Sequence, residues 1–241
     1  SFSIDLDNST NHLRTIVFGA GCFWSVEKKF QETFGVVDVK SGYADGKNIK
    51  PSYKEIIKSK NRFNPNNYAE VVKVTYNSNK TSLENLLMTF FEMHDPTQLN
   101  RQGNDIGVQY RSIILTSSKE ESLLSSDIKV RYQELLSKKG YGPIRTVIKE
   151  LTNFYLAENY HQDYLEKNPN GYCPDNSTGV VFSKKIKNIS NNQDLLIGKK
   201  ILILEAEGCP YCYKLRKDVL NDYQGSVAVS YTHLTLPTRY R

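Results

Sequence analysis

Short apolar runs alternate along the chain with longer segments in which apolar residues recur every three or four positions. The short runs are rich in β-branched residues and are bounded by turn residues, which is typical of strands. The longer segments have the spacing of amphipathic helices. The pattern predicts strands within residues 14–21, 36–44, 69–76, 110–118 and 144–151, and helices over residues 22–33, 82–94 and 119–140.

The predicted helices carry start and stop signals. The helix over 82–94 has Thr81 or Ser82 available as its N-cap, and the helix over 119–140 ends at Gly140. Strands and helices alternate without a clean repeat, and this order predicts a two-layer α/β (α+β) domain.

The pattern changes after Cys173, where the chain becomes polar before a second strand–loop–helix segment begins. We expect one domain over residues 1–183, a linker over 184–198 and an incomplete second unit over 199–228. The stretch "SYTHLTLPT" (230–238) resembles a translated transposase adapter from sequencing libraries, so we interpret residues 229–241 as read-through. The alternative is a natural Thr-rich strand.

Composition narrows the class of protein. The chain has 241 residues, of which 39% are hydrophobic and 24% charged, as in globular domains, and no apolar stretch approaches the roughly 20 residues of a membrane span. Its net charge of +6 is dispersed along the chain, which indicates a solvated basic surface and no nucleic-acid partner. The four cysteines are too few for a secreted disulfide scaffold. We expect a cytoplasmic monomer, although a chain that opens at Ser1 leaves room for a missing leader and export.

One cysteine stands where a strand gives way to a helix, in "GCFWSVE" (21–27). Unpaired backbone N–H groups at a helix start favour the thiolate form, so Cys22 is a candidate nucleophile. Phe23 and Trp24 would give it an apolar wall suited to a small apolar group such as a methyl thioether. The alternative is a buried structural cysteine beside two core aromatics.

Further motifs extend this pattern over roughly residues 14–180. They are "SGYADG", "PSYKEI", "YAEVVKVTY", "FFEMHDPTQLNRQGNDIGVQYRSIIL" and "FYLAENYHQDYLEKNPNGYC". In order and spacing, the set resembles the peptide methionine sulfoxide reductase A family. The resemblance implies a ferredoxin-like mixed sheet with flanking helices and a long irregular C-terminal segment.

The resemblance also implies a chemistry for individual residues. Cys22 would attack the sulfoxide sulfur and become a sulfenic acid, and Glu70 would donate the proton, which requires a raised pKa. Tyr53 and Tyr110 would hydrogen-bond the sulfoxide oxygen, and Asp105 would order the pocket. From the residues alone, Glu70 reads as an exposed strand carboxylate and Asp105 as a turn residue.

Recycling would use the remaining cysteines. Cys173, in a loop rich in Gly, Pro and Asn, matches the family's resolving cysteine and would form a disulfide with Cys22; a leftover loop cysteine is the alternative. The motif "GCPYC" resembles the redox site of thioredoxin and glutaredoxin proteins, with Cys209 as attacking thiolate and Cys212 as second thiol. We interpret 199–228 as the start of a fused thioredoxin-like unit, with half a zinc site as the alternative.

The family match predicts the partners. It implies a peptide-methionine (S)-S-oxide reductase that acts on oxidised proteins and free methionine sulfoxide, without a bound cofactor. A thioredoxin or glutaredoxin-like dithiol would supply electrons.

His94 and His161 lack metal-pair spacing, so we expect both to be structural hydrogen-bonding residues and expect no metal. Two other classes stay open, namely another thiol enzyme (peroxidase-like or acyl-transferring) and a module that binds oxidised methionine without turnover.

Overall fold

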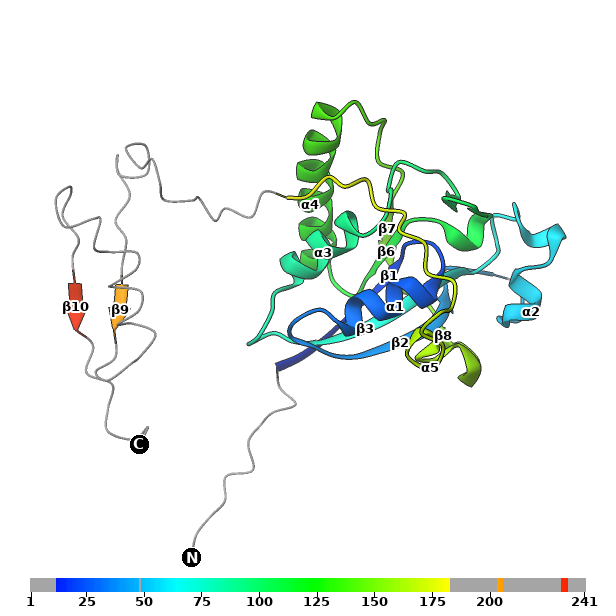
Figure 1. Ribbon diagram of the computed structural model, residues 1–241, viewed down its shortest axis with the longest axis horizontal. Coiled ribbons are helices and arrows are strands. Elements are labelled where there is room, and N and C mark those ends of the chain that lie inside the picture. Colours follow the sequence, from blue (N-terminus) through cyan, green and yellow to red (C-terminus); the bar gives the residue numbers. More distant parts are fainter. Residues whose placement is uncertain (1–11, 48, 183–202, 206–230, 234–241) are drawn as a thin grey trace, which may run out of the picture. The chain divides into compact units, whose positions relative to one another are not determined.

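The structure is a computed structural model that describes residues 12–47, 49–182, 203–205 and 231–233 (Figure 1). The chain divides into two units, Ser1–Phe182 and Ser183–Arg241. In the second unit, β9 (Ile203–Glu205) and β10 (Tyr231–His233) form a parallel pair. Cys209, Cys212 and the predicted linker lie outside the described residues, so the predicted domain boundaries stay predictions.

The first unit is built on a mixed six-stranded sheet in the order β7-β6-β1-β3-β2-β8. Only β6 and β7 pair in parallel, and every other neighbouring pair is antiparallel. A separate small sheet pairs β4 (Arg101–Gln102) with β5 (Asp105–Ile106). The six strands are β1 (Leu13–Gly19), β2 (Val36–Ala44), β3 (Ala69–Asn77), β6 (Ile113–Thr116), β7 (Val147–Glu150) and β8 (Phe154–Leu156).

Helices flank this sheet, with α1 across its strands and α3 beside α4 (Figure 1). Ser82 caps α3, because its side chain accepts from the N–H of Asn85, and α4 is followed by Gly140 at φ +80°. The helices are α1 (Phe23–Gln31), α2 (Tyr53–Ile56), α3 (Leu83–Glu92), α4 (Lys119–Lys138) and α5 (Tyr164–Lys167), with 3-10 turns η2 (Ser59–Asn61), η3 (Val108–Tyr110) and η4 (Asn159–His161).

Aromatic stacking joins the sheet to the helices. The ring of Phe18 in β1 stacks on Phe30 of α1 and on Phe90 of α3, each at a centroid distance of 5.0 Å, and all three side chains are buried. A second cluster, which includes Val17 and Val71, covers the opposite face of the sheet. The predicted mixed sheet with flanking helices is therefore confirmed.

The described chain after α5 forms no further helix or strand up to Phe182. It is held against α3 and α4, because Tyr132 Oη donates to the carbonyl of Val180 at 2.7 Å and the N–H of Phe182 donates to Glu92 Oε1 at 2.7 Å. Within the residues described, no helix is long and apolar enough to cross a membrane.

His94 fastens the end of α3 to the sheet. Its Nδ1 lies 2.6 Å from the carbonyl oxygen of Phe90, which can only accept, so Nδ1 carries the proton. Its Nε2 therefore accepts from Ser112 Oγ at 2.7 Å, and Ser112 Oγ lies 2.7 Å from Thr146 Oγ1. This is the structural role expected for His94, and burial lowers the pKa of the side chain to about 4.

This histidine makes folding stability depend on pH. Since the folded pKa lies below the unfolded value of about 6.5, the stabilisation is complete above pH 6.5 and is lost as the pH falls toward 4. We expect the chain to lose about 2–3 kcal/mol of unfolding free energy through His94 between pH 7 and pH 4.5. Denaturant unfolding of the chain and of His94→Gln at both pH values measures this loss. An equal loss in the variant, which cannot titrate there, would contradict it.

Candidate active site

The loop between β1 and α1 presents Cys22 at the start of the helix. Gly21 has φ +95°, a conformation that favours glycine, and a Cβ at this position would come within 2.8 Å of the Gln102 side chain. Cys22 is the N-cap residue of α1, so the backbone N–H groups of Trp24 and Ser25 face its sulfur. The local fold therefore places the thiol at the helix N-terminus, as predicted.

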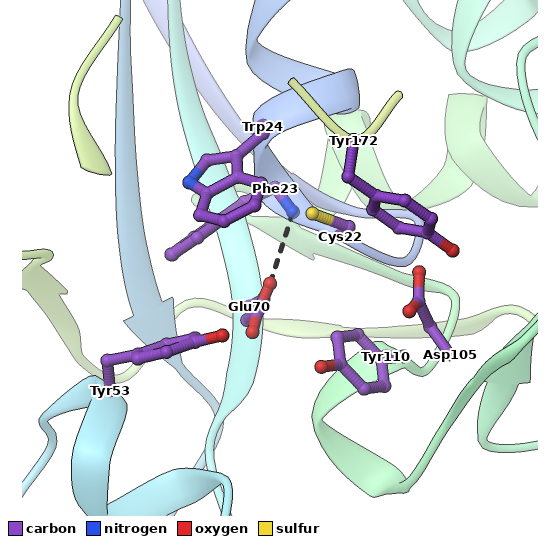
Figure 2. A pocket seen from close by; sticks show the side chains of 8 residues that line it. All are labelled: Cys22, Phe23, Trp24, Tyr53, Glu70, Asp105, Tyr110 and Tyr172. Atoms are coloured by element: carbon purple, nitrogen blue, oxygen red, sulfur yellow. Dashed lines mark hydrogen bonds between the residues drawn. The ribbon is translucent and has the colours of Figure 1, made fainter. Parts of the chain in front are cut away.

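A cavity of about 80 Å³ opens beside this thiol (Figure 2). It brings together side chains from the starts of α1, α2 and β3, from β5 and from η3. Seven of its eight lining residues are those singled out in the sequence, and the eighth is Tyr172. The lining consists of Cys22, Phe23, Trp24, Tyr53, Glu70, Asp105, Tyr110 and Tyr172.

Glu70 is a buried carboxyl in the lining of the cavity. Its side chain is only 2% exposed, and the N–H of Phe23 donates to Oε2 at 3.2 Å. Oε1 is also buried and has no hydrogen-bond partner among the described residues. Burial raises the pKa of Glu70 to about 8, despite the opposing effect of the Phe23 N–H. The carboxyl is therefore mostly protonated at neutral pH, and the exposed-carboxylate interpretation is wrong.

The charge state of Cys22 corrects a prediction. The N–H groups of Trp24 and Ser25 lower the pKa of the thiol, as expected at a helix start. Burial of the sulfur, together with the nearby carboxyls of Glu70 and Asp105, raises this pKa by more. The expectation that the helix start makes the thiolate the favoured form is therefore wrong for this site, and the surroundings of Cys22 favour the neutral thiol. Its proton must leave when the sulfur reacts.

Two phenol groups face the cavity across from the thiol (Figure 2). Burial raises the pKa of Tyr53 to about 12 and also raises the pKa of Tyr110, and the nearby Glu70 acts in the same direction. Both hydroxyls therefore stay protonated and can donate hydrogen bonds to an oxygen in the cavity.

Asp105 and Tyr172 close the other side. Burial raises the pKa of Asp105, while the Tyr172 hydroxyl beside it acts in the opposite direction. One carboxylate oxygen, Oδ2, is buried without a hydrogen-bond partner among the described residues. Sequence reasoning missed Tyr172; the only signal was its place in "GYC", directly before Cys173.

Cys173 itself is exposed and does not line the cavity. Cys22 and Cys173 are both free thiols in the structure. The structure therefore brings together all the predicted cavity residues but leaves the predicted resolving cysteine outside them. Among the described residues, no cluster of three or more His, Cys, Asp or Glu side chains is arranged to hold a metal ion.

Comparison with known proteins bears directly on this cavity. The family model described as peptide methionine sulfoxide reductase matches residues 14–193. The chain belongs to the peptide methionine sulfoxide reductase family. It is an oxidoreductase of that family, and the predicted reductase activity is confirmed.

Individual relatives agree with the family match. The chain is 49% identical over 171 residues to the human mitochondrial peptide methionine sulfoxide reductase, covering 71% of each chain. It is 45% identical over 173 residues to the Corynebacterium kroppenstedtii enzyme of this family, covering 70% of this chain and 76% of the relative. The solved methionine sulfoxide reductase A of Corynebacterium diphtheriae has a TM-score of 0.62 and 40% identity, over 70% of this chain and 82% of that one.

The family match covers the cavity and ends before the CxxC motif. It contains Cys22, Glu70 and Cys173, whereas Cys209 and Cys212 lie beyond residue 193. For a reductase of this family, the cavity offers a thiol, a protonated carboxyl and two phenol donors around one small space.

Proposed function

We propose that the chain reduces the S epimer of methionine sulfoxide in peptides by attack of Cys22 on the sulfoxide sulfur. The observation that carries this is the buried, mostly protonated carboxyl of Glu70 beside the Cys22 thiol, with one oxygen left without a partner. A sulfoxide oxygen is a poor leaving group until it is protonated, and Glu70 holds the proton where that oxygen would lie.

The proposed reaction consists of one oxygen transfer and two proton transfers. Glu70 protonates the sulfoxide oxygen while Tyr53 and Tyr110 hydrogen-bond it, and the Cys22 sulfur attacks the substrate sulfur. The thiol proton returns to the Glu70 carboxylate, so the acid is restored. The bond between the two sulfurs then breaks as the hydroxyl passes from the substrate sulfur to the Cys22 sulfur. This leaves a Cys22 sulfenic acid and releases methionine as the reduced thioether.

Phe23 and Trp24 supply the apolar wall of the cavity. We assign them to the substrate methyl group, because a small apolar group gains from burial against aromatic rings. Asp105 would order the opposite side. The three groups on the substrate sulfur, namely the oxygen, the methyl group and the peptide side, then each point in a fixed direction. Only one of the two epimers fits this arrangement.

The thiol is then regenerated in two steps. Cys173 attacks the Cys22 sulfenic acid, and a Cys22–Cys173 disulfide and water form. A thioredoxin-type dithiol reduces this disulfide, and the Cys209–Cys212 pair is a candidate for it on motif grounds. The exposure of Cys173 supports this role, because the sulfur is accessible and does not contribute to the packed core.

Several finer statements stay predictions. These are the use of free methionine sulfoxide, the monomeric state and a cytoplasmic location. The human relative is described as mitochondrial, so the family match does not support a cytoplasmic location.

Epimer selectivity tests the proposed function. With dithiothreitol as reductant, the full chain should release methionine from a peptide carrying the S sulfoxide and none above background from the same peptide carrying the R sulfoxide. Chromatography of the two products makes the comparison, with each peptide serving as the matched control of the other. Equal turnover of both epimers, or of neither, would refute the assignment.

A further inference from the structure

The ring of His161 packs against three residues that line the cavity. His161 is 1% exposed, and its ring lies 5.0 Å from Phe23, 5.7 Å from Trp24 and 4.5 Å from Tyr53, measured between centroids. Each of these three residues lines the cavity, although His161 does not. One imidazole therefore supports both the apolar wall and one of the two phenol donors.

The hydrogen bond of His161 fixes its protonation state. Trp24 Nε1–H can only donate, and it lies 3.0 Å from His161 Nδ1, so Nδ1 is the acceptor and the proton is on Nε2. Burial lowers the pKa of His161, and the nearby Glu158 opposes this only in part. The neutral form is the one required, since an imidazolium would direct a second N–H at the indole.

Neighbouring residues fix the turn that carries His161 and the indole that His161 contacts. Glu158, at the other end of the same turn, accepts from Tyr43 Oη at 2.6 Å and from the N–H of Tyr53 at 2.9 Å. The indole of Trp24 also stacks on the ring of Tyr164, at a centroid distance of 3.8 Å. Trp24 is therefore fixed by a ring that stacks on it and by a nitrogen that accepts its only polar hydrogen.

We propose that His161 is a positioning residue for substrate binding, acting through the Trp24 indole. This rests on the proposed function, in which Trp24 borders the substrate methyl group. The methyl group carries no charge that develops during reaction, so His161 should affect substrate and transition state equally. Its loss is then expected to raise KM and to leave kcat nearly unchanged.

The sequence offers a direct spectroscopic readout, because Trp24 is the only tryptophan of the chain. A ¹H–¹⁵N spectrum of the full chain therefore contains one indole signal, which reports the hydrogen bond to His161. His161→Phe keeps an aromatic ring and removes the acceptor. His161→Asn removes the ring and keeps an oxygen close to the place of Nδ1.

We expect the indole signal of His161→Phe to move upfield and its hydrogen to exchange faster with solvent, whereas His161→Asn keeps the signal near its original position. With the S-sulfoxide peptide, KM should rise about tenfold in His161→Phe, with kcat within about twofold. His161→Asn should recover most of the lost affinity. Circular dichroism verifies that each variant is folded.

Two results would overturn the proposal. One is an unchanged indole signal in His161→Phe, which would mean that the hydrogen bond is not formed. The other is a shifted signal with unchanged KM, which would make His161 structural only. The Cys22→Ser variant separates this proposal from the proposed function, since it should lose turnover and keep the indole signal. A Cys22→Ser protein that still turns over would reject the proposed function and leave the indole result standing.

Discussion

Replacing Glu70 by Gln is expected to lower kcat by roughly 10²- to 10⁴-fold, the range typical for loss of a general acid. The amide keeps the size of the side chain and can remain close to the N–H of Phe23, but it has no acidic proton to give. Steady-state reduction of an S-sulfoxide peptide with dithiothreitol measures the effect. KM should change little, because the proton is transferred during the reaction and not during substrate binding.

Glu27 provides the matched control for Glu70. It is also buried, at 1% exposure, burial also raises its pKa, and it also has an oxygen without a hydrogen-bond partner among the described residues. It does not line the cavity. Glu27→Gln should therefore keep kcat within about twofold. If both substitutions lower kcat equally, the loss would follow from removing any buried carboxyl, and the role of Glu70 would be refuted.

The pH profile follows from the same carboxyl. Because the pKa of Glu70 is raised to about 8, its acid form predominates below that pH and is lost above it. Activity of the unmodified chain should fall as the pH rises through about 8, and the residual activity of Glu70→Gln should lack this decline. The Cys22 thiol adds no opposing rise in this range, since its pKa lies far higher.

The sequence predicted the elements where local pattern and tertiary environment agree. The strand expected over 36–44 is β2 with the same limits, and its second half supplies the core residues Val39, Tyr43 and Ala44, whereas Val37 near its start is exposed. The end strand β8 was missed, since Tyr155 and Leu156 are exposed and make no buried stripe. The strand predicted from residue 110 begins at Ile113 because Val108–Tyr110 form a 3-10 turn, which turns Tyr110 toward the cavity.

The sequence alone does not show which titratable side chains are buried. Glu70 is followed in β3 by Val71 and Val72, which belong to the two hydrophobic clusters, and a strand with two buried faces gives no polar side for a carboxylate. The family resemblance selected Glu70, whereas only the fold shows why its proton is retained. The favoured protonation state of Cys22 was predicted wrongly for the same reason. A helix start is visible in the sequence, whereas the desolvation of the sulfur is not. Tyr172 was missed because its cavity contact depends on the path of the irregular segment after α5.

Replacing Cys22 by Ser is expected to abolish methionine release with any reductant, because a hydroxyl is too weak a nucleophile to take the oxygen. Replacing Cys173 by Ser should have a different effect. Turnover with dithiothreitol should persist, since a small thiol can reduce the Cys22 sulfenic acid directly. Turnover with a thioredoxin-type dithiol should fall to background, because no protein disulfide forms.

Mass spectrometry distinguishes these schemes through the products that accumulate without reductant. After one exposure to the S-sulfoxide peptide, the unmodified chain should contain a Cys22–Cys173 disulfide, and Cys173→Ser should contain a Cys22 sulfenic acid that dimedone captures. Cys22→Ser should contain neither product. A disulfide between Cys22 and Cys209 in the unmodified chain would reject Cys173 as the resolving cysteine. It would assign the first resolving step to the CxxC motif, whose cysteine would then attack the sulfenic acid itself.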